Sequence, residues 1–323
     1  RLSPTGFDSA LKALGRYRAI LRALNLRHYT AVATAAVRSA ENGPEFINLA
    51  SKALGRRVTV LSGEDEARLS AVGVEASFHA PHGLIGDLGG SSLEFKQIGG
   101  KAERGESLML GPLSLVEGDI DLKALRKTIR AELKTSDVLA RSSGRFYAVG
   151  GAWRTIAKLN MQLENYALQV LQGYQLSKTQ VDKVAKLCFD SLTNSTARAM
   201  LESIDKRRAK HLPVAAMLLQ EILATGRLEG VTISSAGLRE GVLRDALGAP
   251  AHDPLMDGAI AFARLDKNQI LFGEALHEFI APALAPEPDL FGSPAADTRI
   301  EKAACMMADS AGRFHPDHRS IMA

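Results

Sequence analysis

The chain has 323 residues, of which 46% are hydrophobic and 24% are charged, and its formal net charge is a modest +4. This composition excludes a disordered chain, and no apolar run approaches the roughly 20 residues of a membrane-spanning helix. The two cysteines, Cys188 and Cys305, lie far apart without metal-ligand spacing, which excludes a disulfide framework. We therefore expect a cytoplasmic protein without a membrane partner.

The first 78 residues alternate between helix and strand patterns. Ser3-Pro4 is a typical helix start, and apolar residues then recur at helical spacing as far as Asn25. The segments that follow are expected to be, in order, a strand at 28–34, helices at 36–40 and 44–54, a strand at 57–61 and a helix at 64–78. This order is typical of an α/β fold.

From Gly83 the order changes to three antiparallel strands followed by alternating elements. Strands are expected at 83–87, 93–98 and 103–109, then a helix at 122–133, a strand at 145–149, a helix from Ala152, inserted helices at 178–192, 196–204 and 209–223, a strand at 231–234 and a helix at 238–247. Beyond Pro250 the expected elements are all helical, at 253–264, 273–284 and 299–312.

The opening segment matches the latter part of the second unit, without its three leading strands. We infer a duplicated α/β fold whose first copy lacks those strands, with domains at 1–78, 79–248 and 249–323. The alternative is that the similarity is only the alternation common to α/β proteins. In a duplicated fold, the ligand would lie in the cleft between the copies.

The stretch from Leu84 to Ile98 predicts a β-hairpin with a phosphate-sized turn. Its glycines permit positive φ, so successive N–H groups can point into one concavity, formed by Gly89, Gly90, Ser91 and Ser92. Asp87 ends the first strand, and Glu94 points back to the same face, so the two carboxylates are candidate ligands for Mg²⁺. The alternatives are a hairpin without ligand and an Asp87 that only caps its own turn.

Two further groups are candidates for binding an anion. The Gly150-Gly151 turn opens a helix, whose positive N-terminal end favours phosphate. Arg207 and Arg208 belong to a basic cluster at 206–210, which would bind a polyanion or would form a solvated helix face.

Six ordered blocks resemble the exopolyphosphatase and guanosine pentaphosphate phosphatase (Ppx/GppA) family. The blocks are TAVATAAVRSAENG (30–43), VLSGEDEARLSAVGV (60–74), GLIGDLGGSSLEF (83–95), SLMLGPLSL (107–115), YAVGGAWRTIAKL (147–159) and VTISSAGLREGVL (231–243). The resemblance implies two domains of the actin, sugar-kinase and Hsp70 (ribonuclease H-like) type, followed by an all-helical HD-like domain. The family's first block has no counterpart here, and its second glycine turn commonly reads GGGS, so Ser91 replaces a glycine.

The same resemblance implies Mg²⁺-dependent release of terminal phosphate from inorganic polyphosphate. It identifies Glu66 as the catalytic carboxylate that activates water and Arg38 as a substrate contact, and it implies a homodimer without a nucleic-acid partner. Hydrolysis of guanosine pentaphosphate (pppGpp) would use the same residues, and a non-catalytic polyphosphate or nucleotide sensor is the alternative of another class. His315, Asp317 and His318 would be metal ligands or an ordinary helix start.

Overall fold

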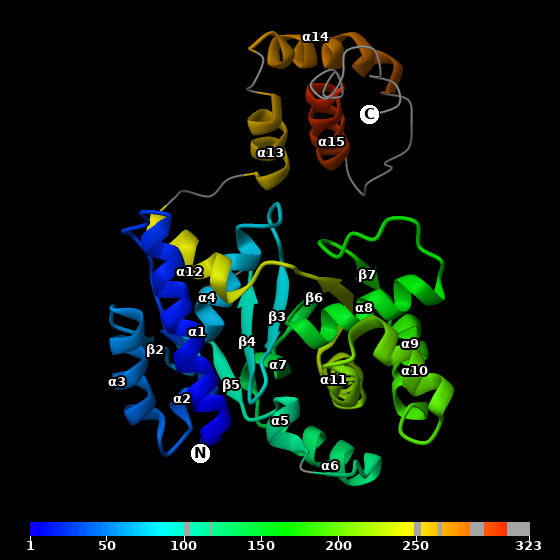
Figure 1. Ribbon diagram of the computed structural model, residues 1–323. Helices are drawn as coiled ribbons and strands as arrows, with labels where there is room; N and C mark the ends of the chain where they lie inside the picture. The colour runs from blue at the N-terminus through cyan, green and yellow to red at the C-terminus, as the bar shows by residue number, and fades with distance from the viewer. Residues whose placement is uncertain (100–103, 117, 249–252, 264–266, 285–293, 309–323) are drawn as a thin grey trace. The chain divides into compact units, whose positions relative to one another are not determined.

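The computed structural model of the protein describes residues 1–99, 104–116, 118–248, 253–263, 267–284 and 294–308. It divides the chain into two compact units, residues 1–249 and 250–323 (Figure 1). None of the helices in these described ranges is both long and apolar enough to cross a membrane. The division of the first unit at residue 78 stays a prediction.

The first part of unit 1, here the small-sheet region (residues 1–61), contains α1 (Pro4–Ala23), β1 (Val32–Ala33), α2 (Ala35–Arg38), α3 (Gly43–Leu54) and β2 (Thr59–Val60). Helix α1 begins where predicted, because Pro4 fits the first turn and the Ser3 side chain accepts a hydrogen bond from the Gly6 N–H. Strands β1 and β2 pair in parallel and are shorter than the sequence patterns indicate.

The large-sheet region (residues 63–248) follows, and its elements are α4 (Gly63–Glu75), β3 (Gly83–Leu88), β4 (Leu93–Ile98), β5 (Glu106–Leu108), α5 (Pro112–Leu115), α6 (Leu122–Leu133), α7 (Asp137–Ala140), β6 (Ser143–Val149), α8 (Gly151–Leu163), β7 (Gln175–Leu176), α9 (Lys178–Asp190), α10 (Ser195–Asp205), a 3₁₀ turn (Ala209–His211), α11 (Leu212–Thr225), β8 (Arg227–Ile233) and α12 (Leu238–Leu247). The strand order is β5-β4-β3-β6-β8-β7. Strands β3, β4 and β5 pair antiparallel, whereas β6 pairs in parallel with both β3 and β8.

Helices cover both faces of this sheet, and the period of two along each strand decides which residue faces which helix. Ile85 and Tyr147 pack against α4, while Leu84 and Phe146 belong to the larger core with α8 and α11. Trp153 of α8 is fully buried there and meets the Phe146 ring edge-to-face, with ring centroids 5.4 Å apart. These aromatic residues therefore belong to the cores on the two faces of the sheet.

Helices α4 and α12 pack closely, backbone against backbone. A Cβ atom added to Gly241 would lie 1.7 Å from the Leu69 carbonyl oxygen, and one added to Gly73 would lie 2.1 Å from the Gly237 carbonyl oxygen. Only glycine permits this approach, so the crossing fixes α4 on the large sheet and beside α12 (Figure 1).

Several elements differ from the sequence patterns. The two-residue strand β7 and the four-residue helices α5 and α7 were not predicted, because each is shorter than the window in which periodicity is visible. The third predicted strand is confirmed but spans only Glu106–Leu108 among the described residues.

The described elements of the second unit are all helical: α13 (Pro254–Ala263), α14 (Lys267–Leu284) and α15 (Pro294–Met307). Helix α14 begins six residues before the predicted start at 273, because residues 268–271 continue its turns. Ala259, Ala303 and Met306 form the buried cluster of this unit, and Arg299 pairs with Asp253.

Candidate active site

Asp87 and Glu94 are direct cross-strand partners. They lie opposite each other in the antiparallel β3–β4 pair, so both side chains leave the same face of the sheet. This is the face that carries Ile85 and packs against α4. Glu94 is 3% exposed, whereas Asp87 is partly exposed. The predicted pairing of the two carboxylates on one face is therefore confirmed.

Glu66 reaches the same place from the first turn of α4. The Ser62 side chain caps this helix by accepting a hydrogen bond from the Asp65 N–H, which sets Glu66 facing inward and 5% exposed. Arg38 of α2 donates a hydrogen bond to Glu66, and the same guanidinium nitrogen donates to the Leu61 carbonyl at 2.6 Å. The Ala35 backbone N–H also donates to Glu66.

Burial raises the pKa of all three carboxyl groups. The pKa of Glu94 rises to about 7, mainly through burial, with further increases from the charges of Glu66 and Asp87. Burial also raises the pKa of Glu66, against the lowering effect of Arg38, and that of Asp87, against the hydroxyl of Ser70. Three carboxylates thus share one poorly solvated space, where a cation would be strongly stabilised.

The turn between β3 and β4 is anchored from one side by α5. The carbonyl of Gly90 accepts from the Leu113 N–H at 2.8 Å, and that of Ser91 accepts from the Gly111 N–H at 3.1 Å. Ser92 is buried and its side chain hydrogen-bonds to Glu94. Neither Gly89 nor Gly90 has a positive φ, so our expectation for their conformation was wrong: the α5 contacts hold the turn instead.

The second glycine turn does have the conformation that only glycine adopts readily. Gly150 has a φ of 121°, and a Cβ atom there would lie 2.5 Å from the Leu88 carbonyl oxygen. Arg208 covers Gly151, since a Cβ atom added to Gly151 would lie 2.6 Å from the Arg208 Nε. The side chain of Arg208 also pairs with Asp205, whereas Arg207 is exposed. One of the two predicted arginines therefore lies at the N-terminus of α8.

Sequence reasoning missed four residues of this site. The Ser70 hydroxyl donates to Asp87, and the Ser107 hydroxyl donates to Glu94 at 2.9 Å. Arg154 lowers the pKa of Asp87 through its charge, and Glu240 raises it. Ser70 lies four residues after Glu66 and Arg154 lies four residues after Gly150, so helical periodicity was a signal for these two.

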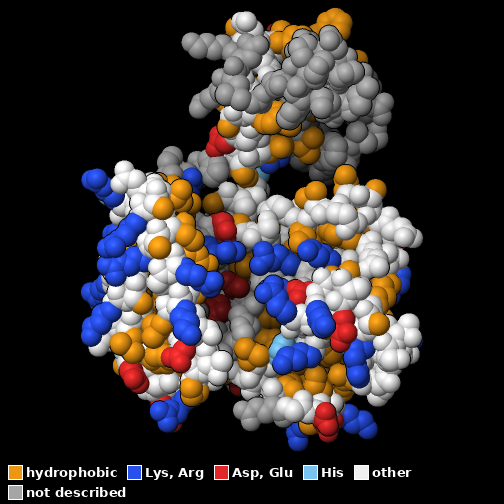
Figure 2. Space-filling view, viewed as in Figure 1, with side chains coloured by type: hydrophobic (Ala, Val, Ile, Leu, Met, Phe, Trp, Pro, Cys, Tyr) orange, Lys and Arg blue, Asp and Glu red, His pale blue; other side chains and the backbone are white. Residues whose placement is uncertain are grey.

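The surface of unit 1 has a furrow on the face shown in Figure 2, with acidic side chains deep in it and Lys and Arg side chains along both of its walls. Among the described residues there is no group of three His, Cys, Asp or Glu side chains placed to hold a metal ion together. Two carboxylates suit Mg²⁺, which usually keeps several waters. His315, Asp317 and His318 lie outside the described residues.

Comparison with known proteins gives matches over most of unit 1. The Ppx/GppA phosphatase family model matches residues 1–249. The chain is 27% identical to retrograde regulation protein 2 of Saccharomyces cerevisiae, over 78% of this chain and 50% of that protein. It is 26% identical to the guanosine-5'-triphosphate,3'-diphosphate pyrophosphatase of Aeromonas salmonicida, over 83% of this chain and 55% of that protein. It is also 26% identical to exopolyphosphatase 1 of Mycobacterium tuberculosis, over 78% and 76% of the two chains.

The chain spans about half the length of the first two of these relatives. Among solved structures, an exopolyphosphatase from Cytophaga hutchinsonii superposes with a TM-score of 0.66 at 24% identity, covering 78% of this chain and 85% of that one. At this identity the similarity supports the fold.

Proposed function

The chain belongs to the Ppx/GppA phosphatase family, and on this premise we propose that it hydrolyses a terminal phosphoanhydride bond and releases orthophosphate. The leading substrate is inorganic polyphosphate. Hydrolysis of pppGpp to ppGpp is the second candidate, since one relative, which is 26% identical to this chain, is named guanosine-5'-triphosphate,3'-diphosphate pyrophosphatase.

The observation that carries the proposal is that Glu66, Asp87 and Glu94 lie near enough for their charges to interact: Asp87 raises the pKa of Glu66, and both raise that of Glu94. Phosphoryl transfer needs an in-line water, a group that orients it and positive charge on the phosphate oxygens. In our proposal Glu66 accepts the proton of the attacking water, and its raised pKa brings it closer to neutral pH. Arg38, held beside Glu66, contacts the phosphate that is transferred.

The phosphates of the substrate would be held by the two glycine turns. The Gly89 N–H donates to the Ser92 carbonyl at 3.0 Å, so the N–H groups of residues 90–92 and the N-terminus of α8 at Gly150-Gly151 would bind the anion. Arg208 lies on that N-terminus and Arg154 follows in the first turn, so both guanidinium groups can neutralise phosphate oxygens there. Arg207 would contact a chain that extends further along the surface.

We propose Asp87 and Glu94 as the ligands of Mg²⁺. They are cross-strand partners whose pKa values are raised mainly by burial and further by neighbouring carboxylates, and hard oxygen ligands of this kind suit the ion. When bound, Mg²⁺ would supply charge neutralisation of the phosphate oxygens. The residues of the chain would orient the water and the substrate.

A duplicated actin-like fold is also part of the proposal. In both regions of unit 1 a parallel strand pair is linked by helices and followed by one more helix: β1 and β2 precede α4, and β6 and β8 precede α12. The two final helices meet at a close glycine crossing, Gly73 on Gly241, as expected for related elements on a pseudo-two-fold axis. The all-helical second unit would then be the HD-like domain.

The experiment is phosphate release by the complete protein from polyphosphate and from pppGpp, with Mg²⁺ and with chelator. We expect Mg²⁺-dependent release from at least one of the two. A protein that binds either compound tightly but releases no phosphate under any of these conditions would instead be a sensor, and the proposed reaction would be wrong.

A further inference from the structure

Ser70 is a buried residue beside the proposed active site, and the proposed reaction does not use it. It lies on α4, one turn after Glu66, so the two side chains share a face of the helix. Ser70 is 1% exposed, and its hydroxyl donates to the Oδ2 atom of Asp87 on β3. One face of α4 therefore carries both the proposed base and a hydrogen-bond donor to a proposed metal ligand.

The acceptor of this hydrogen bond is not the usual one for a serine inside a helix. Such a hydroxyl commonly points to solvent or donates to the backbone carbonyl four residues earlier, here that of Glu66. A hydroxyl has one proton to donate, and Ser70 donates it across to the sheet. Alanine has the higher intrinsic helix propensity, so α4 itself gains no stability from serine at this position. The hydroxyl is therefore explained by Asp87 and not by the helix.

The hydrogen bond from Ser70 leaves Asp87 with one held oxygen and one open oxygen. Gly237, at the start of α12, lies near the held oxygen, since a Cβ atom added to it would lie 3.7 Å from Oδ2. Within the part of the chain that the structure describes, Oδ1 of Asp87 accepts no side-chain hydrogen bond. A carboxylate held at one oxygen no longer rotates freely about its terminal bond, so the direction of Oδ1 is fixed.

Glu94 is held in a comparable way, but by residues of other elements. Its Oε1 atom accepts a hydrogen bond from Ser107 of β5 at 2.9 Å, and Ser92, just before β4, also bonds to it. Neither of these donors belongs to α4. Ser70 thus links the helix that carries the proposed base to the proposed metal ligands, and the glycine crossing with α12 holds that helix in place.

We propose that Ser70 is a positioning residue for the divalent cation: its hydroxyl holds Asp87 so that Oδ1 faces the ion, at a position relative to Glu66 that α4 sets. The inference rests on the proposed function for the ion and for Glu66. Hydrogen-bond partners of metal ligands orient those ligands, and their loss typically weakens metal binding by about 10- to 100-fold.

The test is binding of Mn²⁺ to the complete protein without substrate, measured by electron paramagnetic resonance of the free ion. Mn²⁺ is the probe because it prefers the same oxygen ligands as Mg²⁺. Ser70→Ala should bind Mn²⁺ about 10-fold more weakly than the wild type, and in phosphate release the half-saturating Mg²⁺ concentration should rise by the same factor. An unfolding midpoint measured in chelator checks that the variant is folded.

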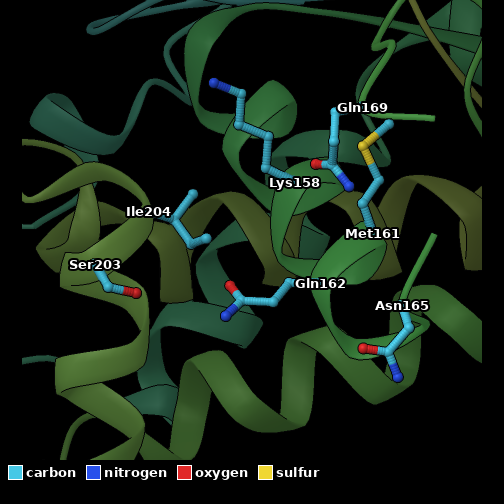
Figure 3. A pocket seen from close by; sticks show the side chains of 7 residues that line it. All are labelled: Lys158, Met161, Gln162, Asn165, Gln169, Ser203 and Ile204. Carbon is cyan, nitrogen blue, oxygen red and sulfur yellow. The ribbon is translucent and has the colours of Figure 1, made fainter. Parts of the chain in front are cut away.

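Ser191→Ala is the matched control, because Ser191 is also buried and its hydroxyl donates to a backbone carbonyl, that of Cys188, at 2.6 Å. A second control is Ser203→Ala, in a polar cavity of about 540 Å³ between α8 and α10 (Figure 3). Among the described residues that line this cavity there is no carboxylate, so we do not expect it to hold the ion. Both control variants should bind Mn²⁺ like the wild type.

Equal Mn²⁺ affinities of Ser70→Ala and the wild type would overturn the inference. An equal loss of affinity in Ser191→Ala, or a wild type that does not bind Mn²⁺, would overturn it as well. Failure of the proposed reaction would appear separately, as absent phosphate release from a protein whose Mn²⁺ affinity still depends on Ser70.

Discussion

The small-sheet and large-sheet regions of unit 1 are held together in different ways. Helix α1 has no buried residue, and the buried cluster of the small-sheet region consists of Phe46, Ala50, Leu54 and Val58. The large-sheet region instead has a continuous core in which side chains as large as Trp153 are fully buried. The difference indicates that local opening of the small-sheet region costs less free energy than opening of the large-sheet region.

This difference matters because Glu66 lies at the junction of the two regions. Its helix, α4, packs on the large sheet and against α12, but its carboxylate accepts hydrogen bonds from Arg38 and Ala35 of the small-sheet region. Asp87 and Glu94 belong entirely to the large sheet. The less stable region therefore orients the proposed base, and the more stable region holds the proposed metal ligands.

The largest effect is expected at the junction itself. Glu66→Gln keeps the size of the side chain and removes the base, so turnover should fall by about 10²- to 10⁴-fold while substrate binding persists. The matched control is Glu64→Gln, on the same turn but exposed, which should retain wild-type turnover. Steady-state phosphate release measures both, and equal rates for Glu66→Gln and the wild type would remove Glu66 from the reaction.

The next effect concerns Glu94 in the more stable region. Its folded pKa of about 7 lies above the ordinary 4.5, so the folded state holds the proton more tightly and stability falls as pH rises through this window. The free energy of unfolding, measured by urea titration without divalent cations, should therefore fall by about 3 kcal/mol between pH 4 and 8 relative to Glu94→Gln. Parallel pH curves for the two proteins would contradict the shift. Added Mg²⁺ should reduce the fall in the wild type.

A smaller loss of stability is expected from a change at the crossing of α4 and α12. Gly241→Ala places a methyl group against the Leu69 carbonyl, so the helices must separate, at a cost of about 1–3 kcal/mol in the free energy of unfolding. Thermal unfolding measures this loss. Unchanged stability would mean that the crossing does not hold α4 in place.

The smallest effect on stability is expected in α1, where a Cβ atom added to Gly15 would have no neighbour within 4 Å. Gly15→Ala should stabilise the protein by about 0.5–1 kcal/mol, since alanine favours a helix and meets no neighbour. Hydrogen exchange should slow in α1 and stay unchanged in β3 and β6. Slower exchange in those strands as well would show that the two regions unfold together rather than separately.

The sequence by itself determined the element order and much of the hairpin. Alternation with a period of two is enough to place Asp87 and Glu94 on one face, because the two residues flank a short turn and their register follows from local geometry. The helix start at Ser3-Pro4 was likewise visible from its cap. Family resemblance, not pattern, identified Glu66 and Arg38.

Only the tertiary structure decided which residues meet across elements. Arg38 and Glu66 are 28 residues apart, and Ser107 reaches Glu94 from a neighbouring strand. The contact of Arg208 with Gly151 and the glycine crossing between α4 and α12 have no local signature in the sequence. Such contacts depend on how helices pack on a sheet, and packing is fixed by the shape of the whole core, whereas periodicity and caps depend on a few neighbouring residues.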